Sequence, residues 1–294
     1  MFDVTAIGEC CVDLVGIVNY MPKENTKKDI SSFKEIIGGS ASNATIALTN
    51  LGLKTTLISK IGNDAYGQFI KKELSKSGIN IANLKENLTF TPYHFVVLAK
   101  KNQSRTIFKR KNKNEILDEL SEFDKFTISK SKAILMDRKS EKVGLEAIEI
   151  AKKHKVIVSF DPSDKYNSYI EKVIKKTDVL IAPQGFIKFL KNKTDVHKAL
   201  TELWQLNKGI VVITLGPKGC IATNGKKIVE VPRYSKTKIV DTNGAGDVFH
   251  GAFLYAIIRR WSLEKACKFA NQIAALKCSV IGNNLKKLNL IKYT

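Results

Sequence analysis

The chain has 294 residues, of which 44% are hydrophobic and 26% charged, a composition that can bury a sizeable globular core. No apolar run approaches the roughly 20 residues that span a bilayer, and the first residues do not resemble a signal peptide, so we expect a cytoplasmic protein without a membrane segment. The formal net charge is +21, but only six of the 49 basic residues are Arg, the side chain that nucleic-acid readers favour, so we expect no specific nucleic-acid binding.

Five cysteines are scattered along the chain, with one adjacent pair and no CxxC spacing. That pattern fits neither a disulfide framework nor a zinc site. We therefore expect small buried side chains at these positions and no metal ion held by the protein itself.

Taken in chain order, short β-branched runs alternate with longer amphipathic ones. Strands are predicted at 2–8, 55–62, 132–137, 155–161, 177–183 and 209–216, and helices at 42–52, 65–78 and 140–154. This alternation predicts an α/β fold with a mostly parallel central sheet. Several of the strands end in Asp, Pro or Gly, at the edge where open α/β sheets bind ligands.

Two stretches, at about 10–32 and 89–112, break this alternation. The second contains "PYHFVVLAKKNQSRTIFKR", whose pattern predicts an antiparallel hairpin turning at "KKNQS". Two β segments inserted into an α/β core predict a small β-sheet lid over the active edge. Because the chain has no repeat and no linker, we interpret residues 1–294 as a single domain with this lid.

The segment "IIGGSASNATIALTNLG" carries the first candidate site. Gly38 and Gly39 permit positive φ and a close approach of the backbone to a ligand. Ser40 and Asn43 supply short polar groups where the next helix starts. A strand-to-helix turn with a polar N-cap explains the same residues equally well.

The segment "DTNGAGDVFHGAF" carries the second candidate site. Gly244, Ala245 and Gly246 are small, so their N–H groups can converge on an anion at the N-terminus of the following apolar helix. Asp247 lies in the first turn of that helix. A carboxylate beside a phosphate cradle suits phosphoryl transfer, in which the amides stabilise charge and Asp247 accepts a proton from the attacking hydroxyl. The alternative is a carboxylate that only caps the helix.

Together the two segments resemble the two signatures of the ribokinase (PfkB-type) sugar and nucleoside kinases, and the similarity spans nearly the whole chain. The resemblance implies an ATP-dependent kinase with a ribokinase-like three-layer α/β/α fold and a small β-sheet lid. It also implies that Asp247 is the catalytic base, and that Gly244, Ala245 and Gly246 form the anion hole for the γ-phosphate.

Motif details resemble the ketohexokinase and fructokinase branch of the family. The stretches "DLVGIVNYMPKENT", "GGSASN" and "NQSRTI" carry this similarity, although the branch has Asn where this chain has Ser40. The resemblance implies a small ketose such as fructose as the substrate. Its hydroxyls would be bound by Asp13, Gly39, Ser40, Asn43 and Arg105, beside Asp247.

For the nucleotide, the resemblance implies an ATP site formed by Thr214, Gly216, Gly219, Gly244, Gly246 and Asn271. Many members carry an "NxxE" motif that helps organise Mg²⁺. Here Gln184 and Ile187 stand at those positions in "LIAPQGFIKFL". We therefore expect Mg²⁺ to arrive on ATP, held mainly by phosphates and water.

Several alternatives stay open at this point. A nucleoside kinase would use Tyr93 and Phe95 as a slot for the base, whereas a 2-keto-3-deoxygluconate kinase would use Lys109 or Arg110 to bind the carboxylate. A ribose kinase, or a catalytically weak relative that binds sugar or nucleotide as a signal, fits the same signatures. The exposed β-edges of the lid also predict a homodimer, because unpaired strands seek partners.

Overall fold

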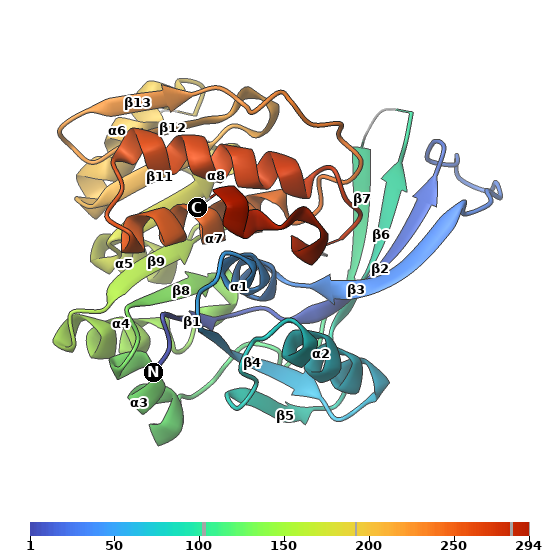
Figure 1. Ribbon diagram of the computed structural model, residues 1–294, viewed down its shortest axis with the longest axis horizontal. Coiled ribbons are helices and arrows are strands. Elements are labelled where there is room, and N and C mark those ends of the chain that lie inside the picture. The colour runs from blue at the N-terminus through green and yellow to red at the C-terminus, as the bar shows by residue number, and fades with distance from the viewer. Residues whose placement is uncertain (102–103, 192, 283–284, 294) are drawn as a thin grey trace.

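A nine-stranded sheet forms the centre of the computed structural model, which describes residues 1–101, 104–191, 193–282 and 285–293 (Figure 1). In spatial order its strands are β13 (Ile228–Val231), β12 (Cys220–Thr223), β11 (Ile210–Thr214), β10 (Val179–Pro183), β9 (Ile157–Asp161), β8 (Ala133–Asp137), β1 (Val4–Ile7), β4 (Thr55–Gly62) and β5 (Leu84–Leu88). The strands from β11 to β5 are parallel to one another, and β12 and β13 add an antiparallel edge.

Helices cover both faces of this sheet. One continuous cluster of buried hydrophobic side chains places α1 (Ser40–Asn50), α2 (Ala65–Lys76), α7 (Ala245–Ile258) and α8 (Leu263–Lys277) on one face. The other face carries α3 (Glu122–Ser129), α4 (Gly144–Lys153), α5 (Ser168–Lys176) and α6 (Val196–Asn207). The predicted α/β fold with three layers is therefore confirmed.

Short 3₁₀ turns complete the chain at η1 (Arg138–Ser140), η2 (Gln184–Phe189), η3 (Gly216–Lys218), η4 (Leu285–Leu288) and η5 (Leu290–Tyr293). The helix predicted at 140–154 begins later, at Gly144, because Asp137 accepts from the amide of Lys139 and caps the turn η1 instead. Within the described part of the chain, no helix is long and apolar enough to cross a membrane.

A second, four-stranded sheet forms the lid, which stands apart from the main sheet at the right of Figure 1. Its order is β3 (Ser32–Gly38), β2 (Cys11–Val18), β6 (Tyr93–Ala99) and β7 (Ser104–Arg110). The first lid segment was predicted to end near residue 32, but its second strand begins there and continues to Gly38. Residues 102–103 of the predicted hairpin turn lie outside the described residues.

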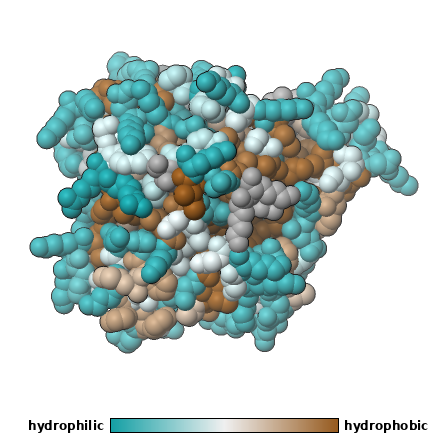
Figure 2. Space-filling model, viewed as in Figure 1, coloured by the Kyte–Doolittle hydropathy of each residue, from teal (hydrophilic) through white to brown (hydrophobic). Residues whose placement is uncertain are grey.

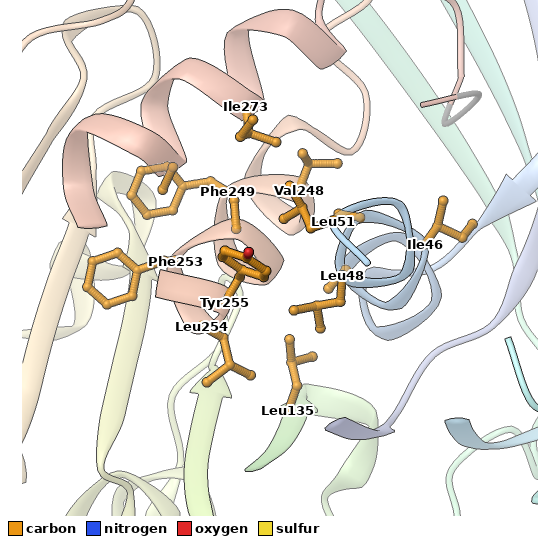
Figure 3. Packing of buried hydrophobic residues seen from close by; sticks show 14 of the residues in the cluster. Ile46, Leu48, Leu51, Leu135, Val248, Phe249, Phe253, Leu254, Tyr255 and Ile273 are labelled. Carbon is orange, nitrogen blue, oxygen red and sulfur yellow. The ribbon is translucent and has the colours of Figure 1, made fainter. Parts of the chain in front are cut away.

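The helices α1 and α7 pack closely because small residues meet between them. A Cβ added to Gly251 would lie 2.7 Å from the carbonyl oxygen of Ala44, so no larger residue fits there. Around this contact Figure 3 shows Val248 of α7 next to α1, and Leu48 of α1 on the side that faces α7. Each buried side chain of this kind contributes roughly 1.5–3 kcal/mol. The packing therefore fixes the N-termini of both helices relative to each other.

Hydrophilic side chains are distributed around the face shown in Figure 2 rather than gathered at one place. All five cysteines are buried and free, as their spacing predicts.

Candidate active site

The N-termini of α1 and α7 bring Asn43 and Asp247 into contact. The amide nitrogen Nδ2 of Asn43 donates to Oδ2 of Asp247 at 2.7 Å, although 204 positions separate them in the sequence. Burial raises the pKa of the Asp247 carboxyl above its ordinary value, while hydrogen bonds from Asn43 and Ser40 oppose that rise. Such an environment suits a carboxylate that takes up a proton during a reaction.

The loop before α7 has the backbone geometry of an anion cradle. Gly244 adopts φ 74°, ψ 4°, in the left-handed region that favours glycine, and Ala245 begins the helix. The first amides of a helix have no intrahelical acceptor, and they carry the positive end of the helix dipole. A Cβ added to Gly246 would meet no atom within 4 Å, so this side of the helix end is open. The residues predicted for the anion hole thus line an open helix N-terminus beside Asp247.

Asp13 lies in β2 on the lid, within a network of buried polar side chains. Its Oδ2 accepts from Nδ2 of Asn243 at 2.8 Å, and its Oδ1 lies 3.1 Å from Nδ1 of His94. The thiol of Cys11 lies 3.5 Å from the same His94 nitrogen and 3.7 Å from Asp13 Oδ1. Gly38 leaves room for this carboxylate, since a Cβ there would lie 2.2 Å from Oδ1. Asp13, predicted to bind sugar, therefore connects the lid to the loop before α7.

Gly39 and Ser40 form the start of α1. Gly39 has φ +100°, and a Cβ at this position would lie 2.4 Å from the carbonyl oxygen of Glu9, so glycine is required. Ser40 reaches Asp247 by a side-chain hydrogen bond. Both predicted substrate residues thus lie at the edge occupied by Asp247.

Arg105, on the lid strand β7, reaches across to the core. Its Nη1 donates to the carbonyl oxygen of Thr242 at 2.9 Å and lies 3.1 Å from the Thr242 hydroxyl. Thr242 belongs to the loop that precedes α7. The lid is therefore joined to the anion loop by Arg105 as well as by Asp13.

The residues predicted to bind ATP lie along the β11–β12 turn. Gly216 (φ +58°) and Gly219 (φ +97°) shape this turn after Thr214. A Cβ at Gly219 would lie 2.0 Å from the carbonyl oxygen of Val231. Asn271 is buried, and its Nδ2 donates to the carbonyl oxygens of Val231 and Pro232 at 3.1 and 3.2 Å. Its amide nitrogen therefore holds the loop after β13.

Two carboxylates at the same sheet edge were not predicted. Asp137, at the end of β8, accepts from the amides of Glu9 and Ala41 at 2.8 and 2.9 Å, and it thereby anchors the start of α1. Burial, reinforced by the charge of Glu9, raises its pKa to about 6. Asp161 ends the neighbouring strand β9, and burial together with the charge of Asp247 raises its pKa to about 7. Their only sequence signal is an Asp at the end of a predicted strand.

Strand alternation separates the two faces of the lid. Asp13, His94 and Lys109 are register partners on β2, β6 and β7, and they therefore share the face that looks toward the site. Tyr93 and Phe95, considered above as a slot for a nucleoside base, occupy the opposite face. Arg110 is also on that outer face, where its Nη1 donates to the hydroxyl of Tyr93 at 3.0 Å.

The fold and the site define a kinase-like α/β protein, with an anion cradle, a neighbouring carboxylate and a lid at one edge of the sheet. Comparison with known proteins agrees: the family model for the pfkB family carbohydrate kinases matches residues 1–288. The chain therefore belongs to the pfkB family of carbohydrate kinases, and it is an ATP-dependent sugar kinase.

The individual relatives are distant in sequence, but each match covers almost the whole length of this chain. The 5-dehydro-2-deoxygluconokinase of Bacillus subtilis is 28% identical over 95% of this chain and 90% of its own. The ATP-dependent 6-phosphofructokinase of Thermoanaerobacterium thermosaccharolyticum is 26% identical over 96% of this chain and 89% of its own. The structure of Arabidopsis thaliana ribokinase complexed with ribose and ATP has a TM-score of 0.81 at 20% identity, covering 100% and 99% of the two chains. Adenosine kinase from Sinorhizobium meliloti has a TM-score of 0.85 at 20% identity, covering 99% and 98%.

Proposed function

We propose that this kinase transfers the γ-phosphoryl group of ATP to a hydroxyl of a small keto sugar, such as the ketose fructose. The observation that carries the proposal is the position of Asp247, which lies in the first turn of α7 beside Gly244–Gly246 and is held by Asn43. Asp247 can therefore accept a proton next to the backbone amides of Gly244–Gly246, which can stabilise a phosphate.

In this mechanism the sugar lies between the lid and the helix ends. Asp13 and Asn43 orient its hydroxyls, since a carboxylate accepts hydrogen bonds and an amide both accepts and donates them. Asp247 takes the proton of the attacking hydroxyl, whose oxygen forms the new bond to the γ-phosphorus. The bond from that phosphorus to the bridging oxygen breaks, and ADP leaves with the electron pair. The amides of Gly244–Gly246 stabilise the charge on the transferred group.

The backbone at the start of α7 and at the β11–β12 turn suits ATP, whereas Gln184–Phe189, the segment after β10, offers no carboxylate for Mg²⁺. The helix N-terminus before Asp247 suits the phosphates, and the turn at Gly216 and Gly219 suits a closely approaching nucleotide. The segment after β10 presents an exposed Gln184 and a buried Ile187, neither of which is a carboxylate ligand. Mg²⁺, when bound, neutralises phosphate charge, and we propose that it is held mainly by the phosphates and water.

A keto sugar acid is the second candidate substrate, and the position of Lys109 favours it. Lys109 shares the site-facing side of the lid with His94, and its charge acts on the buried Cys11 thiol. An ammonium group there would attract a substrate carboxylate. The names of relatives such as 5-dehydro-2-deoxygluconokinase point to the same class.

We further propose a homodimer through the lid. The outer lid face exposes Phe33, Phe95 and Phe108, with exposed fractions of 55%, 49% and 57%. Phe95 and Phe108 are register partners, so they form a continuous apolar surface. A second copy would cover this surface and one of the unpaired strand edges.

The test is ADP release from Mg·ATP with fructose, ribose, 5-dehydro-2-deoxygluconate, 2-keto-3-deoxygluconate, fructose 6-phosphate and adenosine. Turnover on a keto sugar that is lost in Asp247→Asn supports the proposed reaction. A Lys109→Gln variant separates the two candidates, because it raises KM for a sugar acid and leaves KM for fructose unchanged. Turnover on adenosine alone would overturn the proposal, and ATP binding without turnover would favour a regulatory relative.

A further inference from the structure

The C-terminal residue of α8, Lys277, forms a completely buried ion pair with Asp241. Its Nζ donates to the carbonyl oxygen of Asp241 at 3.0 Å and to the carboxylate oxygen Oδ2 at 3.1 Å. Both side chains have 0% exposure. Taking a Lys and an Asp fully out of water is costly, so such a pair needs a reason beyond general stability.

Asp241 holds the loop that leads into the anion cradle. Its Oδ1 accepts from the amide of Asn243 at 2.8 Å, and its Oδ2 accepts from the amide of Gly282 at 2.8 Å. The carbonyl oxygen of Cys278 accepts from the amides of Val240 and Asp241, at 2.7 and 3.0 Å. The ammonium of Lys277 therefore stands where the loop before α7 and the turn after α8 are joined.

The same short loop also contacts the lid and leads into the anion cradle. Asn243 donates to Asp13, Thr242 accepts from Arg105, and Gly244 follows directly as the first residue of the cradle. A small displacement of Asp241 would therefore move the cradle and both of its lid contacts together.

We propose that Lys277 is a positioning residue for phosphoryl transfer. Its buried ammonium acts through Asp241 to hold the loop before α7 in a fixed position relative to the lid. Its side chain is fully buried and its ammonium donates to Asp241, so it acts through that residue. The inference rests on the proposed function, because that function makes the loop an anion hole. The proposal also predicts that a variant with a truncated Lys277 side chain binds a small alkylammonium ion in the space that the side chain leaves.

The test compares Lys277→Ala with the wild type in the ADP-release assay. Displacement of catalytic groups by about 1 Å costs on the order of 10²-fold, and we expect kcat of the variant to fall by about that factor. Ethylammonium should restore kcat in a saturable way, because it replaces the missing ammonium and part of its stem. Tetramethylammonium at the same ionic strength should not, because it has no N–H donor for the two Asp241 oxygens.

A control separates positioning from loss of stability. Asn207 is buried and donates to the carbonyl oxygens of Ile174 and Thr177 at 2.7 and 2.8 Å. It lies just before the start of β11, at the end of the sheet opposite the site. Asn207→Ala should lower the melting temperature while kcat and the response to ethylammonium stay as in the wild type. Loss of kcat in Lys277→Ala without recovery by ethylammonium, or unchanged kcat, would overturn the proposal.

Removing one member of a buried pair can prevent folding, so a second variant is needed. The double variant Lys277→Met with Asp241→Asn removes both charges and keeps similar volumes. We expect it to fold with reduced kcat, because an Asn side chain has one acceptor oxygen where Asp241 serves two amides and an ammonium. Wild-type kcat in the folded double variant would contradict the positioning role.

Failure of the proposed function looks different. If the wild type phosphorylates none of the sugars, calorimetric titration with Mg·ATP replaces the rate as the readout. Weaker ATP binding in Lys277→Ala that ethylammonium restores would still support the inference, and equal binding in both proteins would overturn it.

Discussion

The variant Asp247→Asn tests the proposed base most directly, and the structure gives its expected effect. Asn43 donates Nδ2 to Oδ2 of Asp247 at 2.7 Å. An asparagine at 247 must therefore turn its carbonyl oxygen toward Asn43, which leaves its NH₂ group facing the sugar hydroxyl. An NH₂ group donates a hydrogen bond and cannot accept the proton. We expect kcat to fall by roughly 10²–10⁴-fold, or about 3–5 kcal/mol of barrier, with ATP binding largely kept.

A matched control exists elsewhere in the chain. Asp124 is buried in α3 and accepts from Nδ2 of Asn83 at 2.7 Å, the same kind of contact at the same distance. Asp124→Asn should lower stability through the helix cap while leaving kcat unchanged. Steady-state ADP release measures both variants, and its pH dependence adds a check. The wild-type rate should fall with decreasing pH through the raised pKa of Asp247, and Asp247→Asn should lack that limb. Retention of more than about a tenth of kcat in Asp247→Asn would refute the assignment of the base.

Three further predictions concern the nucleotide turn, the core and the lid. Gly219→Ala forces a Cβ against the Val231 carbonyl oxygen at positive φ, so it should lower the unfolding free energy by more than about 1 kcal/mol and raise KM for ATP, measured by denaturation and kinetics. Burial lowers the pKa of His250 to about 3, so it stays neutral when folded but charges when unfolded, and stability is lost as pH falls below about 6.5. Between pH 7 and pH 5 the wild type should lose about 2 kcal/mol relative to His250→Gln, and a constant difference in urea unfolding would contradict this. Replacing Phe95 and Phe108 with Ser should give a monomeric mass in sedimentation if the lid is the dimer interface; an unchanged dimer argues for another surface.

Residues near one another in the sequence were the predictable part of this molecule. The periodicity gave the strand at 55–62 with its observed ends, and the "GAGD" segment located a helix N-terminus with a carboxylate beside it. The contacts that complete the site were not predictable, because they join distant positions. Asp13 and Asn243 are 230 positions apart, and Asp137 anchors Ala41 across 96. An Asp after a strand or a Lys at a helix end, as at 277, is too common a pattern to predict such a partner.

Charge is distributed in this molecule in a way that links its stability to its ligand. The chain carries a formal net charge of +21, yet Asp137, Asp161 and Asp247 gather at one edge of the sheet. The pKa values of Asp137 and Asp161 are raised from the ordinary 3.8 to about 6 and about 7. Each carboxyl therefore costs folding free energy as the pH rises above that ordinary value, and the cost is complete once the pH exceeds the folded pKa. The net positive charge attracts anionic ATP over a distance, while the local carboxylates favour an arriving cation. If ATP brings Mg²⁺, as we propose, the complex satisfies both demands, and its binding should stabilise the folded protein by mass action as well as supply the phosphoryl group.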